Sequence, residues 1–177
     1  YYATNTQPGG VNLVGSWHST GASGDIAEPR ENACGSVNGH PNIAILDSGV
    51  DRDHPDLDDN IAGVFGSGRN FRSIFTGVGE WRDVEDVTGH GTRVAGVAAA
   101  RGHNGLGVAG AAYLCRIQPF VITDTGSSGN GNTAYVAMAL AYMRQVGAPK
   151  IAVIPFQMHD VPGVVNEAAA FRNAGGI

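Results

Sequence analysis

Asn42-Ile43-Ala44-Ile45-Leu46 is a short, almost wholly apolar run, and Asp47-Ser48-Gly49 ends it. An apolar run of this length that stops at a polar turn is typical of a strand buried on both faces of a parallel sheet. We therefore predict a central strand over residues 42–46, with Asp47 at its carboxyl end. Ligand sites of open α/β sheets lie just beyond such strand ends, which makes Asp47 a candidate functional residue.

The segments that follow alternate between helical and extended patterns. The small residues of Val94-Ala95-Gly96-Val97-Ala98-Ala99-Ala100 have almost no polar face, so they predict a helix that is buried all round. Further strands are predicted over residues 113–122 and 150–156, further helices over 132–146 and 164–174, and one or two short strands joined by loops within 51–88. This alternation predicts an α/β fold with a mainly parallel sheet between helices.

The bulk properties fit one soluble, compact domain. The chain has 177 residues, of which 42% are hydrophobic and 15% charged. The formal net charge is -5 and Lys and Arg form no cluster, so neither nucleic acid nor a membrane surface is an expected partner. Cys34 and Cys115 are compatible with one disulfide or with two buried thiols, and the sequence does not decide between them.

His90 lies between Gly89 and Gly91, where the chain turns into the predicted buried helix. The flanking glycines let the backbone approach closely on both sides of the imidazole. A helix N-terminus disfavours the imidazolium form, while a nearby carboxylate such as Asp47 would fix the tautomer and stabilise a transient cation. These are the conditions that a general base requires. Either residue alone is more often a cap or a packing residue, so the prediction depends on the pair.

Two long motifs carry a resemblance to a known family. Residues 45–50, Ile-Leu-Asp-Ser-Gly-Val, followed by His54-Pro55-Asp56-Leu57, resemble the aspartate motif of the subtilases (peptidase family S8). His90-Gly91-Thr92-Arg93-Val94-Ala95-Gly96 resembles their histidine motif and comes in the same order. Residues 104–110 are similar to the loop after the histidine helix, and Gly126-Ser127-Ser128-Gly129 to a substrate-lining loop. A chance match of two such motifs in this order is improbable.

The resemblance implies a three-layer subtilisin-like fold. Residues 42–177 would form part of the peptidase domain, truncated on its C-terminal side. Residues 1–41, rich in Gly, Asn, Ser and Pro, would be an irregular lead-in to that domain.

The implied activity is hydrolysis of peptide bonds through an acyl-enzyme. Asp47 would orient His90, and His90 would take the proton of a serine nucleophile. Neither Ser127 nor Ser128, the last serine of the chain, fits the serine motif of the family, and the oxyanion asparagine would come after Ile177. We therefore expect an active protein that is longer than this chain, and no activity from the 177 residues alone.

The resemblance also implies substrate-binding residues, with one departure from the family. The residues are Gly126, Ser127, Ser128, Gly129, Gln157 and Met158. Where subtilases usually have Asn-x-Ser-Leu-Gly, this chain has Pro155-Phe156-Gln157-Met158-His159. The larger side chains would narrow the pocket, and Pro155 has no backbone N–H to donate to a substrate.

A structural calcium ion is the metal that the resemblance implies. Asp56 and Asn104, together with backbone carbonyls, would supply the oxygen ligands that this hard cation prefers. The alternative is an acidic loop that is simply solvated. No cofactor is expected for catalysis.

The expected partner is a polypeptide substrate, and the sequence leaves open whether there is also an inhibitory propeptide. The protein is expected to be secreted and monomeric. A catalytically inactive subtilase homologue that acts as a binding or scaffold domain is the alternative, and the departure at residues 155–159 supports it. An unrelated nucleotide-binding α/β domain is the weakest alternative. No Gly-x-Gly-x-x-Gly follows the first strand, and the anionic Asp47 stands where a phosphate would bind.

Overall fold

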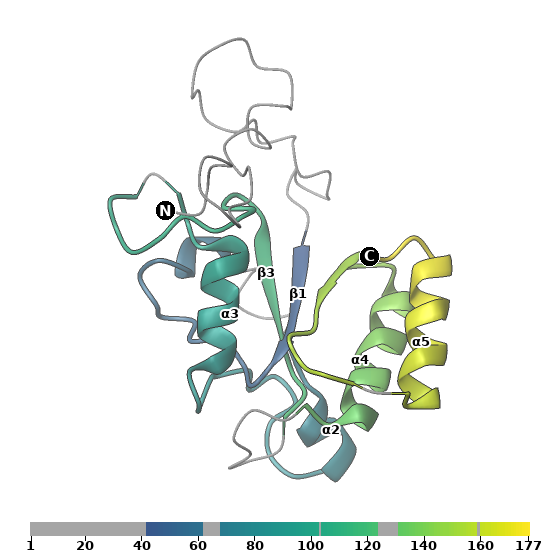
Figure 1. Ribbon diagram of the computed structural model, residues 1–177. Helices are drawn as coiled ribbons and strands as arrows, with labels where there is room; N and C mark the ends of the chain where they lie inside the picture. Colours follow the sequence, from purple (N-terminus) through teal and green to yellow (C-terminus); the bar gives the residue numbers. More distant parts are fainter. Residues whose placement is uncertain (1–41, 62–67, 103, 124–130, 159) are drawn as a thin grey trace. The chain divides into compact units, whose positions relative to one another are not determined.

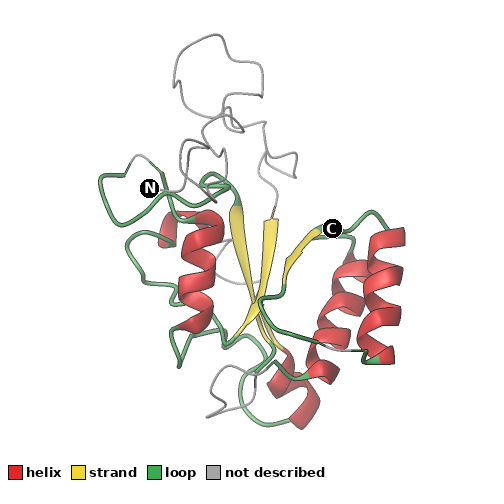
Figure 2. Cartoon of the chain, viewed as in Figure 1, coloured by secondary structure: helices red, strands yellow, loops and turns green. Residues whose placement is uncertain are grey.

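The computed structural model describes residues 42–61, 68–102, 104–123, 131–158 and 160–177, and these contain a four-stranded parallel sheet (Figure 2). The strands are β1 (Asn42–Asp47), β2 (Arg69–Asn70), β3 (Arg116–Val121) and β4 (Ile151–Val153). Their order in the sheet is β2-β3-β1-β4, so β1 pairs with a strand on each side. The predicted central strand is thereby confirmed. The predicted lead-in, residues 1–41, lies outside the described residues, as does Cys34, while Cys115 is buried.

Helices lie on both sides of the sheet, which confirms the predicted α/β layers (Figure 1). α3 (His90–Ala99) lies on one side of β1 and β3, whereas α4 (Thr133–Val146) and α5 (Pro162–Asn173) pack together on the other. Among the described residues, no helix is long and apolar enough to cross a membrane.

The main core lies between the sheet and α4. Alternate residues of β1, Ala44 and Leu46, face this core because side chains alternate across a strand. Val136, Leu140 and Met143 recur along α4 at helical spacing and are all buried there. Local signals set the ends of α4: the Asn132 side chain accepts a hydrogen bond from the N–H of Ala134 (3.0 Å), and Gly147 ends the helix at φ 74°.

The prediction that the helix after His90 is buried all round was wrong. Ala95 and Ala99 of α3 are buried against the sheet, but Val97 is 76% exposed and Arg93 is exposed as well. The small side chains recur every four residues, so they line up as one narrow stripe rather than covering the helix. That stripe packs against the sheet, and at Gly91 there is no space for a Cβ beside Gly49 and Asp47.

The region between β1 and α3 contains a helix that the sequence did not predict. α2 (Phe71–Thr76) follows β2 directly, and η1 (Asp58–Asn60) is one turn of 3-10 helix. α2 begins at Asn70, whose side chain accepts from the N–H of Ser73 (3.0 Å), and ends at Gly77 with φ 69°. Six residues are too few to show helical periodicity, so only these end signals could have revealed it.

β4 is shorter than predicted, and its outer edge has a partner. Pro155 lacks an N–H, which fits the end of the strand at Val153. Ile177 donates its N–H to the carbonyl of Lys150 (2.7 Å) and accepts from the N–H of Ala152 (2.9 Å). Ile177 thus extends the hydrogen bonding of the sheet beyond β4.

A substitution in the main core tests this packing. Leu140 is 2% exposed within the core, whereas Leu106 is 53% exposed in a loop. Leu140→Ala should lower the free energy of unfolding by about 2–5 kcal/mol, because it leaves a cavity. Leu106→Ala should change it by no more than about 0.5 kcal/mol. Urea unfolding measures both, and equal losses from the two variants would contradict the described core.

Candidate active site

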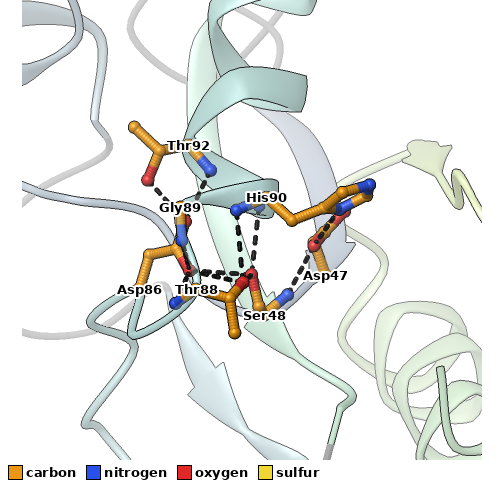
Figure 3. A network of polar contacts seen from close by, with 8 residues as sticks. Asp47, Ser48, Asp86, Thr88, Gly89, His90 and Thr92 are labelled. Carbon is orange, nitrogen blue, oxygen red and sulfur yellow. Dashed lines mark hydrogen bonds and ion pairs between the residues drawn. The ribbon is translucent and has the colours of Figure 1, made fainter. Parts of the chain in front are cut away.

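Asp47 and His90 meet where β1 ends and α3 begins (Figure 3). Nδ1 of His90 lies 2.8 Å from Oδ1 and 2.9 Å from Oδ2 of Asp47. The Asp47 side chain is fully buried, while that of His90 is 37% exposed. The N–H of Ser48 also donates to Oδ1 of Asp47 (2.7 Å). The imidazole is therefore anchored at Nδ1 by a buried carboxylate, and among the described residues no hydroxyl is hydrogen-bonded to its Nε2.

Gly91 makes this contact between α3 and β1 sterically feasible. A Cβ built at Gly91 would overlap the carbonyl oxygen of Gly49 and lie 2.9 Å from Cβ of Asp47. Gly89, at the start of α3, has φ 75°, a backbone conformation that favours glycine. The two glycines beside His90 were both predicted to allow close approach, but their roles differ. Gly91 leaves space for packing against β1, whereas Gly89 forms the turn into α3.

A network of hydroxyl and carboxylate groups lies behind the pair (Figure 3). Ser48 donates its hydroxyl to Oδ1 of Asp86 (2.7 Å) and accepts from the N–H of Gly91 (3.0 Å). Oδ2 of Asp86 accepts from both the N–H (2.9 Å) and the hydroxyl (2.7 Å) of Thr92. The network links the turn after β1 to the first turn of α3.

The pKa of Asp86 reflects these contacts. Partial burial opposes ionisation, but hydrogen bonds from Thr92, Ser48 and Thr88 together outweigh it and hold the pKa of Asp86 below its ordinary value of 3.8. Asp86 is thus an anion at neutral pH.

Of the segment that departs from the family motif, Phe156 has a ring contact with His90. The ring of Phe156 is 5.5 Å from that of His90, tilted by 30°. Met158 is half-buried beside Gly131, while Gln157 is exposed. A cavity of about 500 Å³ opens next to His90, between the exposed side of α3 and Val153 and Pro155. The other predicted substrate residues, Gly126, Ser127, Ser128 and Gly129, lie outside the described residues.

Asp56 and Asn104 lie next to each other, but their oxygen atoms are not arranged as a coordination site for a metal ion. Oδ1 of Asp56 accepts from the side-chain amide of Asn104 (2.8 Å), and Oδ2 accepts from the N–H of Val108 (2.8 Å). Oδ1 of Asn104 in turn accepts from the N–H of Leu106 (3.1 Å). These oxygens face N–H donors of the chain itself, an arrangement that does not fit a calcium ion as it stands. Calcium binding at Asp56 and Asn104 therefore stays a prediction.

Sequence reasoning missed three residues of this site: Ser48, Asp86 and Phe156. Ser48 was visible only as part of a common turn. Asp86 is one of several acidic residues between β2 and α3, and only its place four residues before His90 sets it apart. Phe156 lay within the departure from the family motif, but nothing in the sequence indicated that its ring would lie against His90.

Comparison with known proteins assigns the family. The model of the subtilase family matches residues 39–157, which include both Asp47 and His90. The chain belongs to the subtilase family. The predicted resemblance is thereby confirmed, and so is the subtilisin-like fold.

Individual subtilases match over part of their length. A thermophilic serine proteinase of Bacillus sp. (strain AK1) is 37% identical over 109 residues, which are 62% of this chain and 24% of that protein. Thermitase of Thermoactinomyces vulgaris is 35% identical over 111 residues, 63% of this chain and 36% of thermitase. A solved structure, the S41 psychrophilic protease, is 28% identical with a TM-score of 0.61, covering 76% of this chain and 43% of that one. The chain thus spans well under half the length of these relatives.

The first prediction for the site concerns the packing of α3. Gly91→Ala should lower the free energy of unfolding by about 1–3 kcal/mol, because the added methyl group has no space beside Asp47 and Gly49. Gly96→Ala is the matched control in the same helix, since a Cβ there meets nothing within 4 Å. The control should be neutral or stabilising by up to about 1 kcal/mol, because alanine favours the helix. Equal destabilisation of both variants in urea would contradict this packing.

The second prediction for the site concerns how the contribution of Asp86 to the free energy of unfolding depends on pH. Since the pKa of Asp86 is lower in the folded chain than its ordinary value of 3.8, its carboxylate stabilises the fold above that value and loses this effect as pH falls through the folded pKa. The difference in unfolding free energy between the wild type and Asp86→Asn should therefore be largest near neutral pH and shrink below about pH 4. Urea unfolding over a pH series measures it, and a difference that is constant with pH is the contrary result.

Proposed function

We propose that this chain is part of a serine-type endopeptidase, to which it contributes the aspartate and the histidine of an Asp-His-Ser triad. The observation that carries the proposal is the contact of Nδ1 of His90 with the fully buried carboxylate of Asp47, at 2.8 Å. The nucleophilic serine and the oxyanion asparagine would come from polypeptide beyond the 177 residues, and the family relationship supports their presence there.

The geometry supports a definite role for each residue. A proton on Nδ1 of His90 is held by Asp47, so the lone pair is on Nε2, which faces away from the carboxylate. Nε2 would take the proton of the serine hydroxyl as its oxygen attacks the peptide carbonyl, and would return it to the leaving amine. Asp47 remains ionised throughout and stabilises the imidazolium that forms in between.

The substrate is proposed to be a polypeptide that binds beside His90. Gln157 and Met158, which follow Phe156 in the chain, are proposed as one wall of the substrate site, and Gly126, Ser127, Ser128 and Gly129 as a second wall. The cavity next to His90 is lined largely by aliphatic side chains of α3 and by Val153, which would favour apolar substrate side chains. Gln157, at the position where the family usually has serine, would narrow the substrate site.

Secretion and a monomeric state are proposed together with this activity. The relatives include a cell wall-associated protease of Bacillus subtilis, 35% identical over 62% of this chain, but also a major intracellular serine protease of the same species. The proposal for secretion therefore rests on the wider family, with the formal charge of -5 as an accompanying property.

The activity is tested on the longer protein that joins this chain to its serine-bearing continuation. A fluorophosphonate probe should label that protein, and the labelling should disappear in His90→Ala because the serine is no longer activated. Asp47→Asn should lower kcat by roughly 10⁴-fold, as the tautomer of His90 is no longer fixed. The isolated 177-residue chain should hydrolyse no peptide substrate.

His54 supplies the control for the labelling experiment. Its Nδ1 accepts the N–H of Asp56 (3.2 Å), away from the catalytic pair, so His54→Gln should still be labelled. Equal labelling of the wild type and His90→Ala would remove His90 from its proposed role. A folded, serine-bearing protein that takes no label at all would favour the inactive binding homologue instead.

A further inference from the structure

Asp86 lies outside the catalytic pair, yet it contacts both segments that carry the pair. Its Oδ1 accepts from the hydroxyl of Ser48, the residue after Asp47, at 2.7 Å. Its Oδ2 accepts from the N–H and the hydroxyl of Thr92, two residues after His90, at 2.9 and 2.7 Å. One carboxylate thus connects the end of β1 with the first turn of α3 (Figure 3).

The first turn of α3 depends on this network for its hydrogen bonds. The first N–H groups of a helix have no partner within the helix, and the usual capping side chain is absent because Gly89 occupies the capping position. The partners come from the network instead: the hydroxyl of Thr88 for His90 (3.2 Å), that of Ser48 for Gly91 (3.0 Å), and Oδ2 of Asp86 for Thr92 (2.9 Å). An anion at this position also interacts favourably with the helix dipole.

The hydrogen bonds of Asp86 require a carboxylate rather than an amide. Both oxygen atoms of Asp86 act only as acceptors in the hydrogen bonds described above. Oδ1 also accepts from the N–H groups of Thr88 (3.0 Å) and Gly89 (2.9 Å). In an asparagine, one oxygen would become an NH₂ group that faces N–H or O–H donors. At least one arm of the connection would be lost, and the donors that face the new NH₂ group would lose their partner in Asp86.

We propose that Asp86 is a positioning residue for the catalytic pair: its carboxylate holds the first turn of α3 against the end of β1, and thereby keeps Nδ1 of His90 within hydrogen-bond distance of Asp47. The kinetic consequence rests on the proposed peptidase function, whereas the effect on the imidazole does not. A small displacement is sufficient to matter, because a shift of about 1 Å in a catalytic group can lower the rate by about 10²-fold.

The imidazole itself gives the first test, in the 177-residue chain. The ¹⁵N chemical shifts of His90 report which ring nitrogen carries the proton in the neutral ring. We expect the proton on Nδ1 in the wild type and a mixture of the two tautomers in Asp86→Asn. Ser48→Ala, which keeps the charge of Asp86 but removes the link to β1, should shift the tautomers in the same direction. This second variant also tests the proposal if Asp86→Asn fails to fold.

The control substitution is Asp83→Asn in the same loop. It removes the same charge, but Asp83 is exposed, and within the described part of the chain its side chain accepts only from the nearby N–H of Glu85 (3.3 Å). It should leave the tautomer of His90 unchanged. An unchanged tautomer in folded Asp86→Asn or folded Ser48→Ala, or an equal change in Asp83→Asn, overturns the proposal.

The second test uses the serine-bearing protein. Asp86→Asn should lower kcat by at least about tenfold and leave KM within about twofold, because it displaces the base without touching substrate. Leu140→Ala, a core variant on the far side of the sheet, should be less stable but keep its kcat at temperatures where it is folded. Equal loss of kcat in both variants would mean that Asp86 acts through stability alone. If the wild type is inactive while the tautomer results hold, the peptidase proposal fails and the positioning of His90 stands.

Discussion

Asp47 is a carboxylate with no exposed surface at the end of the central strand, and burying such a group without partners costs several kcal/mol. Its partners are the N–H of Ser48 and the imidazole of His90. The second partner requires the first turn of α3 to approach the strand end, where only a glycine fits at position 91. That first turn has no capping side chain of its own, so its hydrogen bonds come from Ser48, Thr88 and Asp86. The buried carboxylate of Asp47 thus accounts for Gly91, for the packing of α3 against β1, and for the hydrogen bonds that Ser48, Thr88 and Asp86 make with the first turn of α3.

Much of this could be predicted from the sequence because the signals are local. The apolar run before Asp47, the helical spacing of α4 with Asn132 at its start, and the glycines around His90 each indicate what the structure contains. The failures have physical reasons. α2 is too short to show a period, and the small residues of α3 suggest burial although they form only one stripe. The role of Asp86 could not be predicted, because Asp83 and Glu85 lie in the same loop and only the fold brings one of these three carboxylates to Ser48.

The departure from the family motif at residues 155–158 has a structural counterpart. Pro155 follows the end of β4, and Phe156 then lies against the face of His90. The imidazole is therefore anchored at Nδ1 by Asp47, and the phenyl ring lies 5.5 Å from it between ring centroids. The change in motif alters the surroundings of His90 without removing its contact with Asp47.

The hydrogen bond between Asp47 and His90 joins residues that are 43 positions apart, and this has a consequence for how the protein folds. A contact of that separation requires a long loop to close, with an entropic cost that local structure cannot offset. The strand that carries Asp47 is itself held by β3, whose partner residues lie even further along the chain. Neither β1 nor α3 can assemble the pair by forming alone. A nascent or partly folded chain therefore lacks the contact between Asp47 and His90, which forms only once the non-local pairing of the sheet is complete.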